Sequence, residues 1–198
     1  MAEVFSIIIG YLLGSFPSAY IAGKFKGLDI RKVGDGNAGA ANTFREVGPV
    51  AGFLVILADV FKGVGAIFIA QALTSSQLVV FAAGIAAVAG HVFPVYIGFK
   101  GGRGEATAGG VLVALVPPML ILLAIGLIPF ILTRNTLVLG AIMFAPLWLV
   151  AWITGGSAAL IGYTIGVPCL VGVSHVLTTR HLPEHLRKNG KYLQRVKT

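Results

Sequence analysis

Charged side chains are scarce in this sequence, which excludes a soluble domain with an ordinary surface. Only 11% of the 198 residues are Asp, Glu, Lys or Arg, whereas 57% are hydrophobic. Soluble globular domains carry roughly 25% charged residues. Cysteine is nearly absent too. The single Cys169 excludes a disulfide framework, and because it lies in an apolar run we expect it to be a small buried hydrophobe.

Lys and Arg are missing from four long runs of the chain, namely residues 1–23, 63–99, 104–133 and 135–179. All 15 basic residues lie between or after these runs, at 24–62, 100–103, 134 and 180–197. A charge inside hydrocarbon is costly, so basic side chains stay at the membrane interface unless a site needs them. The pattern predicts an integral membrane protein. The net charge of +8 then indicates basic residues that flank spans, not a nucleic-acid partner.

A span needs about 20 apolar residues. The expected spans are residues 4–23, 49–72, 78–99, 136–153 and 158–179, and the apolar stretch 106–133 forms either one span or two. The stretch 106–133 decides the count, because Pro117 and Pro118 break a helix. As one span, this stretch would put the basic residues of the tail opposite those of residues 24–45. As two short spans, it puts every basic segment on one face, which the positive-inside rule prefers.

We therefore expect an all-α integral membrane protein with about seven transmembrane helices, some of them short or re-entrant. The N-terminus is expected outside and the C-terminus in the cytoplasm. Residues 1–198 are expected to form a single domain with a basic cytoplasmic tail at 180–198. The first residues lack a basic region and a cleavage site, so they are expected to begin the first span and not a signal peptide.

Residues 33–45, VGDGNAGAANTFR, form the first segment that can carry chemistry. Glycines allow tight turns in which backbone N–H groups converge on a small anion. A helix beginning near Ala40 would add its positive end, and Arg45 would offer a planar fork to phosphate. The alternative is a loop that only connects two spans.

A second glycine segment, residues 90–107, contains the turn 100–104, KGGRG, with two cations. Like the first segment, it combines flexible glycines and backbone N–H donors with cations that could bind an anion. The alternative is a basic turn at the membrane interface. His91 lies inside the preceding span. It is either a packed core histidine or a direct participant in catalysis.

Three further ionisable residues stand out. Asp59 and Lys62 are three residues apart on one face of a predicted helix. They either form a structural pair, or Asp59 orients Lys62 toward an anion. His181 follows the last span. It is suited to acid–base chemistry or to donating to phosphate, but the residues alone favour a helix-end histidine. No metal-ligand spacing and no Ser-His-Asp order is present.

Together these segments resemble the bacterial acyl-phosphate:glycerol-3-phosphate acyltransferases, the PlsY family. The residues that carry the resemblance are 14–17 (GSFP), 27–45, 59–63 (DVFKG) and 90–107. The resemblance is dense over residues 10–110 and thin beyond them.

The resemblance implies an enzyme of the bacterial cell membrane whose active site faces the cytoplasm. It would move an acyl group from acyl phosphate to the 1-hydroxyl of sn-glycerol 3-phosphate, giving lysophosphatidic acid and phosphate, the first step of phospholipid synthesis. It implies no cofactor, no metal and no covalent intermediate, and as a partner the enzyme that supplies acyl phosphate. The catalytic residues would be Arg45, Arg103 and His181. Phosphate would be bound by Gly34, Asp35, Gly36, Asn37, Asn42, Lys62, Lys100, Gly101 and Gly102, with Ser15, Asp59 and His91 in support.

The chain departs from the family pattern at Asp35 (usually Ser), Ala41 (Thr), Arg103 (Lys), Glu105 (apolar), Gly140 (Ser) and Glu184 (Asn). Asp35 and Glu184 put carboxylates where a phosphate is expected. Like charges weaken anion binding unless cations counter them. Two alternatives therefore stay open: a paralogue that has another acceptor or has lost its activity, and a membrane transporter or binding protein for a phosphorylated metabolite.

Overall fold

The computed structural model describes residues 1–133 and 136–179. The predicted site residue His181 and the departure Glu184 lie outside the described residues. In chain order the helices are α1 (Ala2–Gly14), α2 (Ser18–Phe25), η1 (Ile30–Lys32), α3 (Ala40–Glu46), α4 (Pro49–Leu73), α5 (Gln77–Val92), η2 (Val95–Ile97), α6 (Glu105–Leu115), α7 (Met119–Thr133), α8 (Thr136–Phe144), α9 (Leu147–Ile153) and α10 (Ala158–Thr179).

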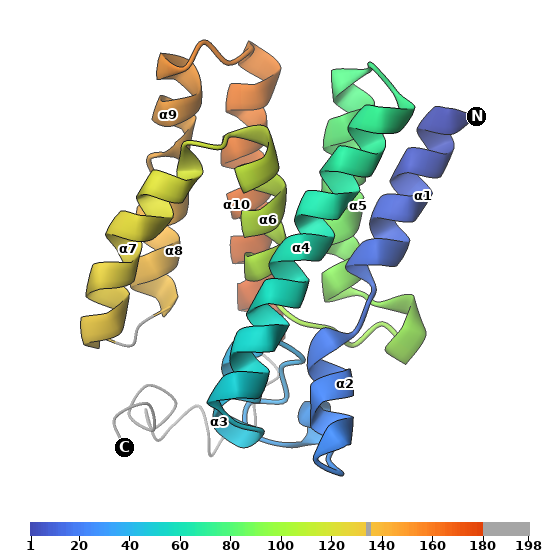
Figure 1. Ribbon diagram of the computed structural model, residues 1–198, viewed down its shortest axis with the longest axis vertical. Coiled ribbons are helices and arrows are strands. Elements are labelled where there is room, and N and C mark those ends of the chain that lie inside the picture. Colours follow the sequence, from blue (N-terminus) through green and yellow to red (C-terminus); the bar gives the residue numbers. More distant parts are fainter. Residues whose placement is uncertain (134–135, 180–198) are drawn as a thin grey trace.

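The helices form one bundle along the long axis of the molecule (Figure 1). α1, α4, α5, α6, α7, the α8–α9 pair and α10 run alternately in opposite directions. Pro117 and Pro118 separate α6 from α7, so the predicted break is confirmed and the chain follows the predicted alternation. The N-terminus lies at one end. Residues 24–48 and 93–104 lie at the other, which we call the loop end.

Two of the predicted spans are each formed by two helices. The first span is divided into α1 and α2 at residues 15–17, and the sixth into α8 and α9 at residues 145–146. Each interruption contains a proline, Pro17 or Pro146. Proline lacks an N–H donor and disfavours the helical conformation in the residue before it.

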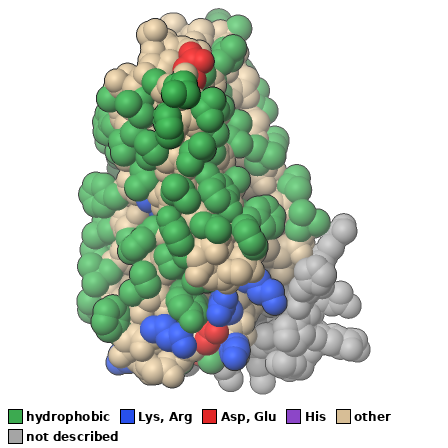
Figure 2. All heavy atoms as spheres, turned by 90° about the vertical axis from the view of Figure 1, so that its right-hand side faces the viewer, with side chains coloured by type: hydrophobic (Ala, Val, Ile, Leu, Met, Phe, Trp, Pro, Cys, Tyr) green, Lys and Arg blue, Asp and Glu red, His purple; other side chains and the backbone are tan. Residues whose placement is uncertain are grey.

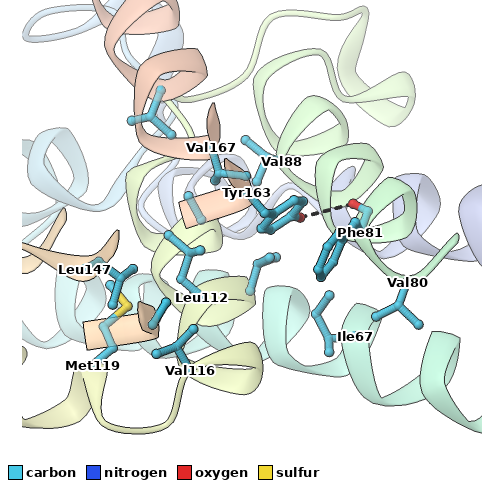
Figure 3. Packing of buried hydrophobic residues seen from close by; sticks show 14 of the residues in the cluster. Ile67, Val80, Phe81, Val88, Leu112, Val116, Met119, Leu147, Tyr163 and Val167 are labelled. Carbon is cyan, nitrogen blue, oxygen red and sulfur yellow. Dashed lines mark hydrogen bonds between the residues drawn. The ribbon is translucent and has the colours of Figure 1, made fainter. Parts of the chain in front are cut away.

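The hydrophobic core gathers where α4, α5, α6, α9 and α10 meet (Figure 3). Ile67, Leu112 and Leu147 are fully buried there. The Tyr163 hydroxyl of α10 donates to the Phe81 carbonyl of α5 over 3.0 Å, and the two rings stack with centroids 4.4 Å apart. A buried tyrosine hydroxyl needs a hydrogen-bond partner, so this bond fixes α10 against α5.

Glycines allow the helices to approach one another closely. A Cβ at Gly14 of α1 would overlap the Ala87 carbonyl of α5, and one at Gly110 of α6 would overlap the Val60 carbonyl of α4. Lipid tails are as apolar as the helices, so association in a membrane depends on the close packing of small residues. These contacts hold α1, α4, α5 and α6 together beside the loop end.

The outer surface is that of a membrane protein. Figure 2 shows hydrophobic side chains over most of one face, with Lys and Arg gathered at the loop end. Within the described residues, four segments are long and apolar enough to cross a membrane: Ala2–Phe25, Pro49–Leu73, Gln77–Ile97 and Ala158–Thr178. Cys169 of α10 is exposed, so the expectation that it is buried was wrong. An apolar run in a membrane protein faces lipid as well as the interior.

Candidate active site

Three charged side chains meet at the loop end. The Asp35 Oδ2 atom lies 3.3 Å from Arg45 Nη2 and 3.2 Å from Arg103 Nη2. The Asp35 side chain is 1% exposed, whereas Arg45 is 21% exposed. Arg45 belongs to α3, and Arg103 precedes α6. The fold therefore brings the arginines of both glycine segments together around one anionic group.

Asn42 organises the first glycine segment. Its side chain is fully buried. Its Nδ2 donates over 3.0–3.1 Å to the backbone carbonyls of Ile30, Val33 and Asn37. Its Oδ1 accepts from the Asp35 N–H and from Arg45 Nη2, both over 3.3 Å. Asn42 thus positions Asp35 and Arg45 through the loop, and its predicted contact with phosphate stays a prediction.

Three backbone N–H groups of this loop, those of Asp35, Gly36 and Asn37, donate within the first glycine segment itself. The Gly36 N–H donates to a loop carbonyl over 3.0 Å, and the Asn37 N–H to Asp35 Oδ1 over 3.2 Å. Gly34 has a φ of +58°, which glycine adopts without a steric cost, and a Cβ there would overlap Asn42 Oδ1. In this geometry the glycines shape the loop, and the two guanidinium groups are the clearest anion-binding groups.

The glycine turn of the second segment packs on His91, which lies in the same segment. The N–H groups of Gly101 and Gly102 donate to the carbonyls of Val92 and His91, each over 3.1 Å. A Cβ at Gly102 would overlap His91 Nε2, so the imidazole lies against the loop backbone. The Ala38 N–H donates to the Gly101 carbonyl over 3.4 Å and so joins the two glycine segments.

Arg31 supplies a second link between residues 24–48 and residues 93–104. It pairs with Asp29 through two hydrogen bonds of 2.8 and 2.9 Å, and its Nη1 donates to the Ile97 carbonyl over 2.7 Å. Its guanidinium lies 4.7 Å from the centre of the Tyr20 ring. The hydrogen bonds from Arg31 lower the pKa of Asp29 to about 2, and Asp29 in turn raises the pKa of Arg31.

Sequence reasoning missed this link. The Asp29 side chain accepts a hydrogen bond from the Arg31 N–H over 3.1 Å. An aspartate that bonds the backbone two residues on is a recurrent turn pattern, so the spacing contained a signal. Arg31 and Ile97 are far apart in the sequence, so their contact left no signal in the spacing of residues.

A second buried charged cluster lies between α4, α5 and α2. Asp59 Oδ1 lies 2.8 Å from Lys62 Nζ, accepts a hydrogen bond of 2.7 Å from the Ser18 hydroxyl, and lies 3.5 Å from His91 Nδ1. Lys62 also donates to the Phe16 carbonyl over 3.2 Å. The predicted pairing of Asp59 with Lys62 is confirmed, and His91 is packed and buried. A phosphate contact for Lys62 stays a prediction.

The other predicted residues lie in different surroundings. Lys100 is exposed. Ser15 is fully buried, and its hydroxyl has no hydrogen-bond partner within the described residues. Glu105 lies 3.3 Å from His175 Nδ1, a residue that sequence reasoning did not single out. No group of three or more His, Cys, Asp or Glu side chains in residues 1–133 and 136–179 could hold a metal ion.

Comparison with known proteins gives a consistent result. The family model for glycerol-3-phosphate acyltransferase matches residues 4–188. Glycerol-3-phosphate acyltransferase 4 of Dehalococcoides mccartyi is 43% identical over 176 residues, which are 88% of this chain and 95% of that protein. The glycerol-3-phosphate acyltransferase of Endomicrobium trichonymphae is 38% identical over 186 residues, covering 93% and 94% of the two chains.

Solved structures agree with the sequence matches. The crystal structure of PlsY, an integral membrane glycerol 3-phosphate acyltransferase, in its glycerol 3-phosphate form superimposes with a TM-score of 0.79 at 32% identity. The match covers 94% of this chain and 98% of that one. The lysophosphatidic acid form gives the same TM-score and identity over 91% of each chain. The chain belongs to the glycerol-3-phosphate acyltransferase family.

Proposed function

We propose that this membrane enzyme transfers a fatty acyl group from acyl phosphate to the 1-hydroxyl of sn-glycerol 3-phosphate, and that Arg45 and Arg103 bind the acceptor's phosphate. The observation that carries the proposal is the convergence of both guanidinium groups on one oxygen, at 3.3 and 3.2 Å. The similar solved structures, described as glycerol 3-phosphate and lysophosphatidic acid forms, support the choice of acceptor and product.

The reaction requires no covalent bond between the protein and a substrate. Acyl phosphate is a mixed anhydride and is already activated. The acceptor oxygen attacks the acyl carbon, the bond from that carbon to the phosphate oxygen breaks, and inorganic phosphate leaves. The hydroxyl proton passes to a phosphate oxygen of a substrate. Catalysis then depends on orientation and on neutralising phosphate charge.

The arginines suit this role because hydrogen bonds tie their segments to each other. Asn42 ties Arg45 to the first loop, and the bond from Ala38 to Gly101 ties that loop to the segment that carries Arg103. A planar guanidinium offers parallel N–H donors to phosphate oxygens. Their place at the loop end supports an enzyme over a transporter, whose site is expected near the bilayer midplane.

The loop end is proposed to face the cytoplasm. Lys24, Lys26, Lys32 and Lys100 are exposed there, and Lys and Arg gather at this end in Figure 2. Cytoplasmic loops of membrane proteins carry an excess of basic residues. A cytoplasmic site also gives access to the water-soluble acceptor, while the acyl chain of the donor stays in the bilayer.

The direct test is acyl transfer by the purified protein in lipid. Palmitoyl phosphate and palmitoyl-CoA are offered in parallel with radiolabelled glycerol 3-phosphate. We expect labelled lysophosphatidic acid when palmitoyl phosphate is the donor and none when palmitoyl-CoA is the donor. Product from palmitoyl-CoA alone, or no product from folded protein with either donor, would contradict the proposal.

A further inference from the structure

We propose that Asp35 sets how tightly the site holds the acceptor's phosphate, because its carboxylate occupies Arg45 and Arg103 when no substrate is bound and competes with phosphate for them. The inference rests on the proposed function, since it takes the acceptor to be glycerol 3-phosphate. It makes Asp35 a residue that determines affinity for the acceptor and gives it no part in the chemical step.

The geometry of the contact is that of a bound anion. One oxygen, Asp35 Oδ2, lies 3.3 Å from Arg45 Nη2 and 3.2 Å from Arg103 Nη2. Donors from two separate segments that converge on one oxygen are the arrangement that a phosphate oxygen would need. The side chain of Asp35 is 1% exposed, so bulk water does little to screen its charge.

The loop aims the carboxylate at the arginines. Asp35 Oδ1 accepts from the Asn37 N–H over 3.2 Å, and the Asp35 N–H donates to Asn42 Oδ1 over 3.3 Å. These bonds hold Asp35 at both its backbone and its side chain. The contact is therefore a built feature of the loop.

The carboxylate changes the charge that an incoming phosphate meets. Two guanidinium groups carry two positive charges, and Asp35 cancels one of them. A phosphate with two negative charges is then attracted less strongly than by the arginines alone. To bind both arginines it must also displace Asp35 from at least one of them. The apparent affinity for phosphate is the intrinsic affinity multiplied by the fraction of molecules in which the arginines are available.

Three substitutions separate charge from shape. Asp35→Asn keeps the shape and removes the charge, Asp35→Ser removes both, and Asp35→Glu keeps the charge. We expect KM for glycerol 3-phosphate to fall about tenfold in the Asn and Ser variants, which corresponds to one decade of affinity, while kcat stays within about twofold. The Glu variant should keep a KM near that of the wild type.

A structural role for Asp35 predicts the opposite result. If the carboxylate only holds the arginines in place, the Asn and Ser variants will show a raised KM and a lowered Tm, and the inference is overturned. Asp29→Asn is the matched control, because it breaks another Asp–Arg pair at the loop end. In that pair, Asp29 Oδ2 lies 2.8 Å from Arg31 Nη2. We expect this variant to leave KM for glycerol 3-phosphate unchanged.

Calorimetric titration with inorganic phosphate, without an acyl donor, separates this inference from the proposed function. Tighter phosphate binding by Asp35→Asn than by the wild type supports the inference whether or not the protein turns over. If the wild type makes no lysophosphatidic acid but the variant binds phosphate more tightly, only the proposed function fails. If turnover is normal but both proteins bind phosphate equally, the inference fails.

Discussion

Within residues 1–133 and 136–179, two buried acidic side chains pair with cations, and they differ in the kind of cation that they meet and in its surroundings. Asp35 at the loop end meets two guanidinium groups, those of Arg45 in α3 and of Arg103 before α6. Asp59 inside the bundle meets Lys62 of its own helix and His91 of the neighbouring helix.

Access distinguishes the two clusters further. Arg45 is 21% exposed, whereas Lys62 and His91 are each 6% exposed. A carboxylate with two guanidinium groups, one of them reachable from solvent, can exchange for another anion. A carboxylate enclosed by helices acts as a clamp between them. We propose a ligand site for the Asp35 cluster, whereas the Asp59 cluster is a packed ion pair between helices. Two predictions test this contrast, and a third concerns the partly exposed Asp29–Arg31 pair.

Removing Arg103 should have the largest effect. Arg103→Ala takes away one of the two donors for phosphate charge, so we expect kcat/KM to fall by at least about a hundredfold while Tm changes little. Steady-state acyl transfer with palmitoyl phosphate measures the first quantity and a thermal melt in detergent the second. Lys26→Ala, an exposed cation at the same end, is the control and should keep its activity. Retained turnover in Arg103→Ala would remove Arg103 from the site.

Substitution in the Asp59 cluster should affect stability more than acceptor binding. Asp59→Asn leaves Lys62 buried without its counter-ion, and breaking a buried pair in this way costs about 3 kcal/mol. A chemical denaturation series in detergent measures this loss. The double variant Asp59→Leu, Lys62→Met should recover much of it, since no charge is left uncompensated. A stable Asp59→Asn protein with a raised KM for glycerol 3-phosphate would show instead that the cluster contacts the acceptor.

The smallest expected effect concerns the Asp29–Arg31 pair. The pKa of Asp29 is lowered to about 2 from its ordinary 3.8. The pair therefore stabilises the fold above pH 4, and this contribution is lost as the pH falls toward 2. At pH 7 we expect Asp29→Asn to cost about 1 kcal/mol, because the pair is partly solvated. Melts at pH 7 and pH 3 should show the gap between variant and wild type narrowing at the lower pH. A gap that does not change with pH would refute the assignment.

The sequence predicted the features that depend on local chemistry. Pro117 and Pro118 predicted a break, and the placement of basic residues predicted that both glycine segments share one end. The breaks at Pro17 and Pro146 were missed because each run is apolar on both sides of the proline. Hydropathy alone shows such a run as one span.

The parts of the candidate site that could not be predicted depend on distant contacts. The spacing of Asp59 and Lys62 predicted their pairing, but nothing in the sequence predicted that Ser18 would bond to Asp59 or that Arg31 would reach Ile97. The contact of Asn42 with phosphate stays a prediction, and nothing in the sequence predicted that its buried amide would hold the loop. The sequence shows that an amide is present, and only the fold shows which groups it meets.

The turn between α6 and α7 shows how this chain reverses after a short helix. α6 has 11 residues, about 17 Å at 1.5 Å per residue, which is far less than the roughly 30 Å of a bilayer's hydrocarbon core. Val116 and Met119, on either side of the reversal, are 2% and 0% exposed. Pro117 at the apex is exposed, so the reversal lies at the margin of the bundle with Val116 and Met119 packed inward. In contact with hydrocarbon, an N–H group without an acceptor is costly.

The two prolines solve this problem by having no N–H group to satisfy. The remaining N–H groups around the turn all donate to carbonyl oxygens over 2.7–3.0 Å, from Val116, Met119, Leu120 and Ile121. Every backbone donor from residue 116 to residue 121 is accounted for. The two prolines therefore end α6 without adding an N–H group that the reversal would have to satisfy.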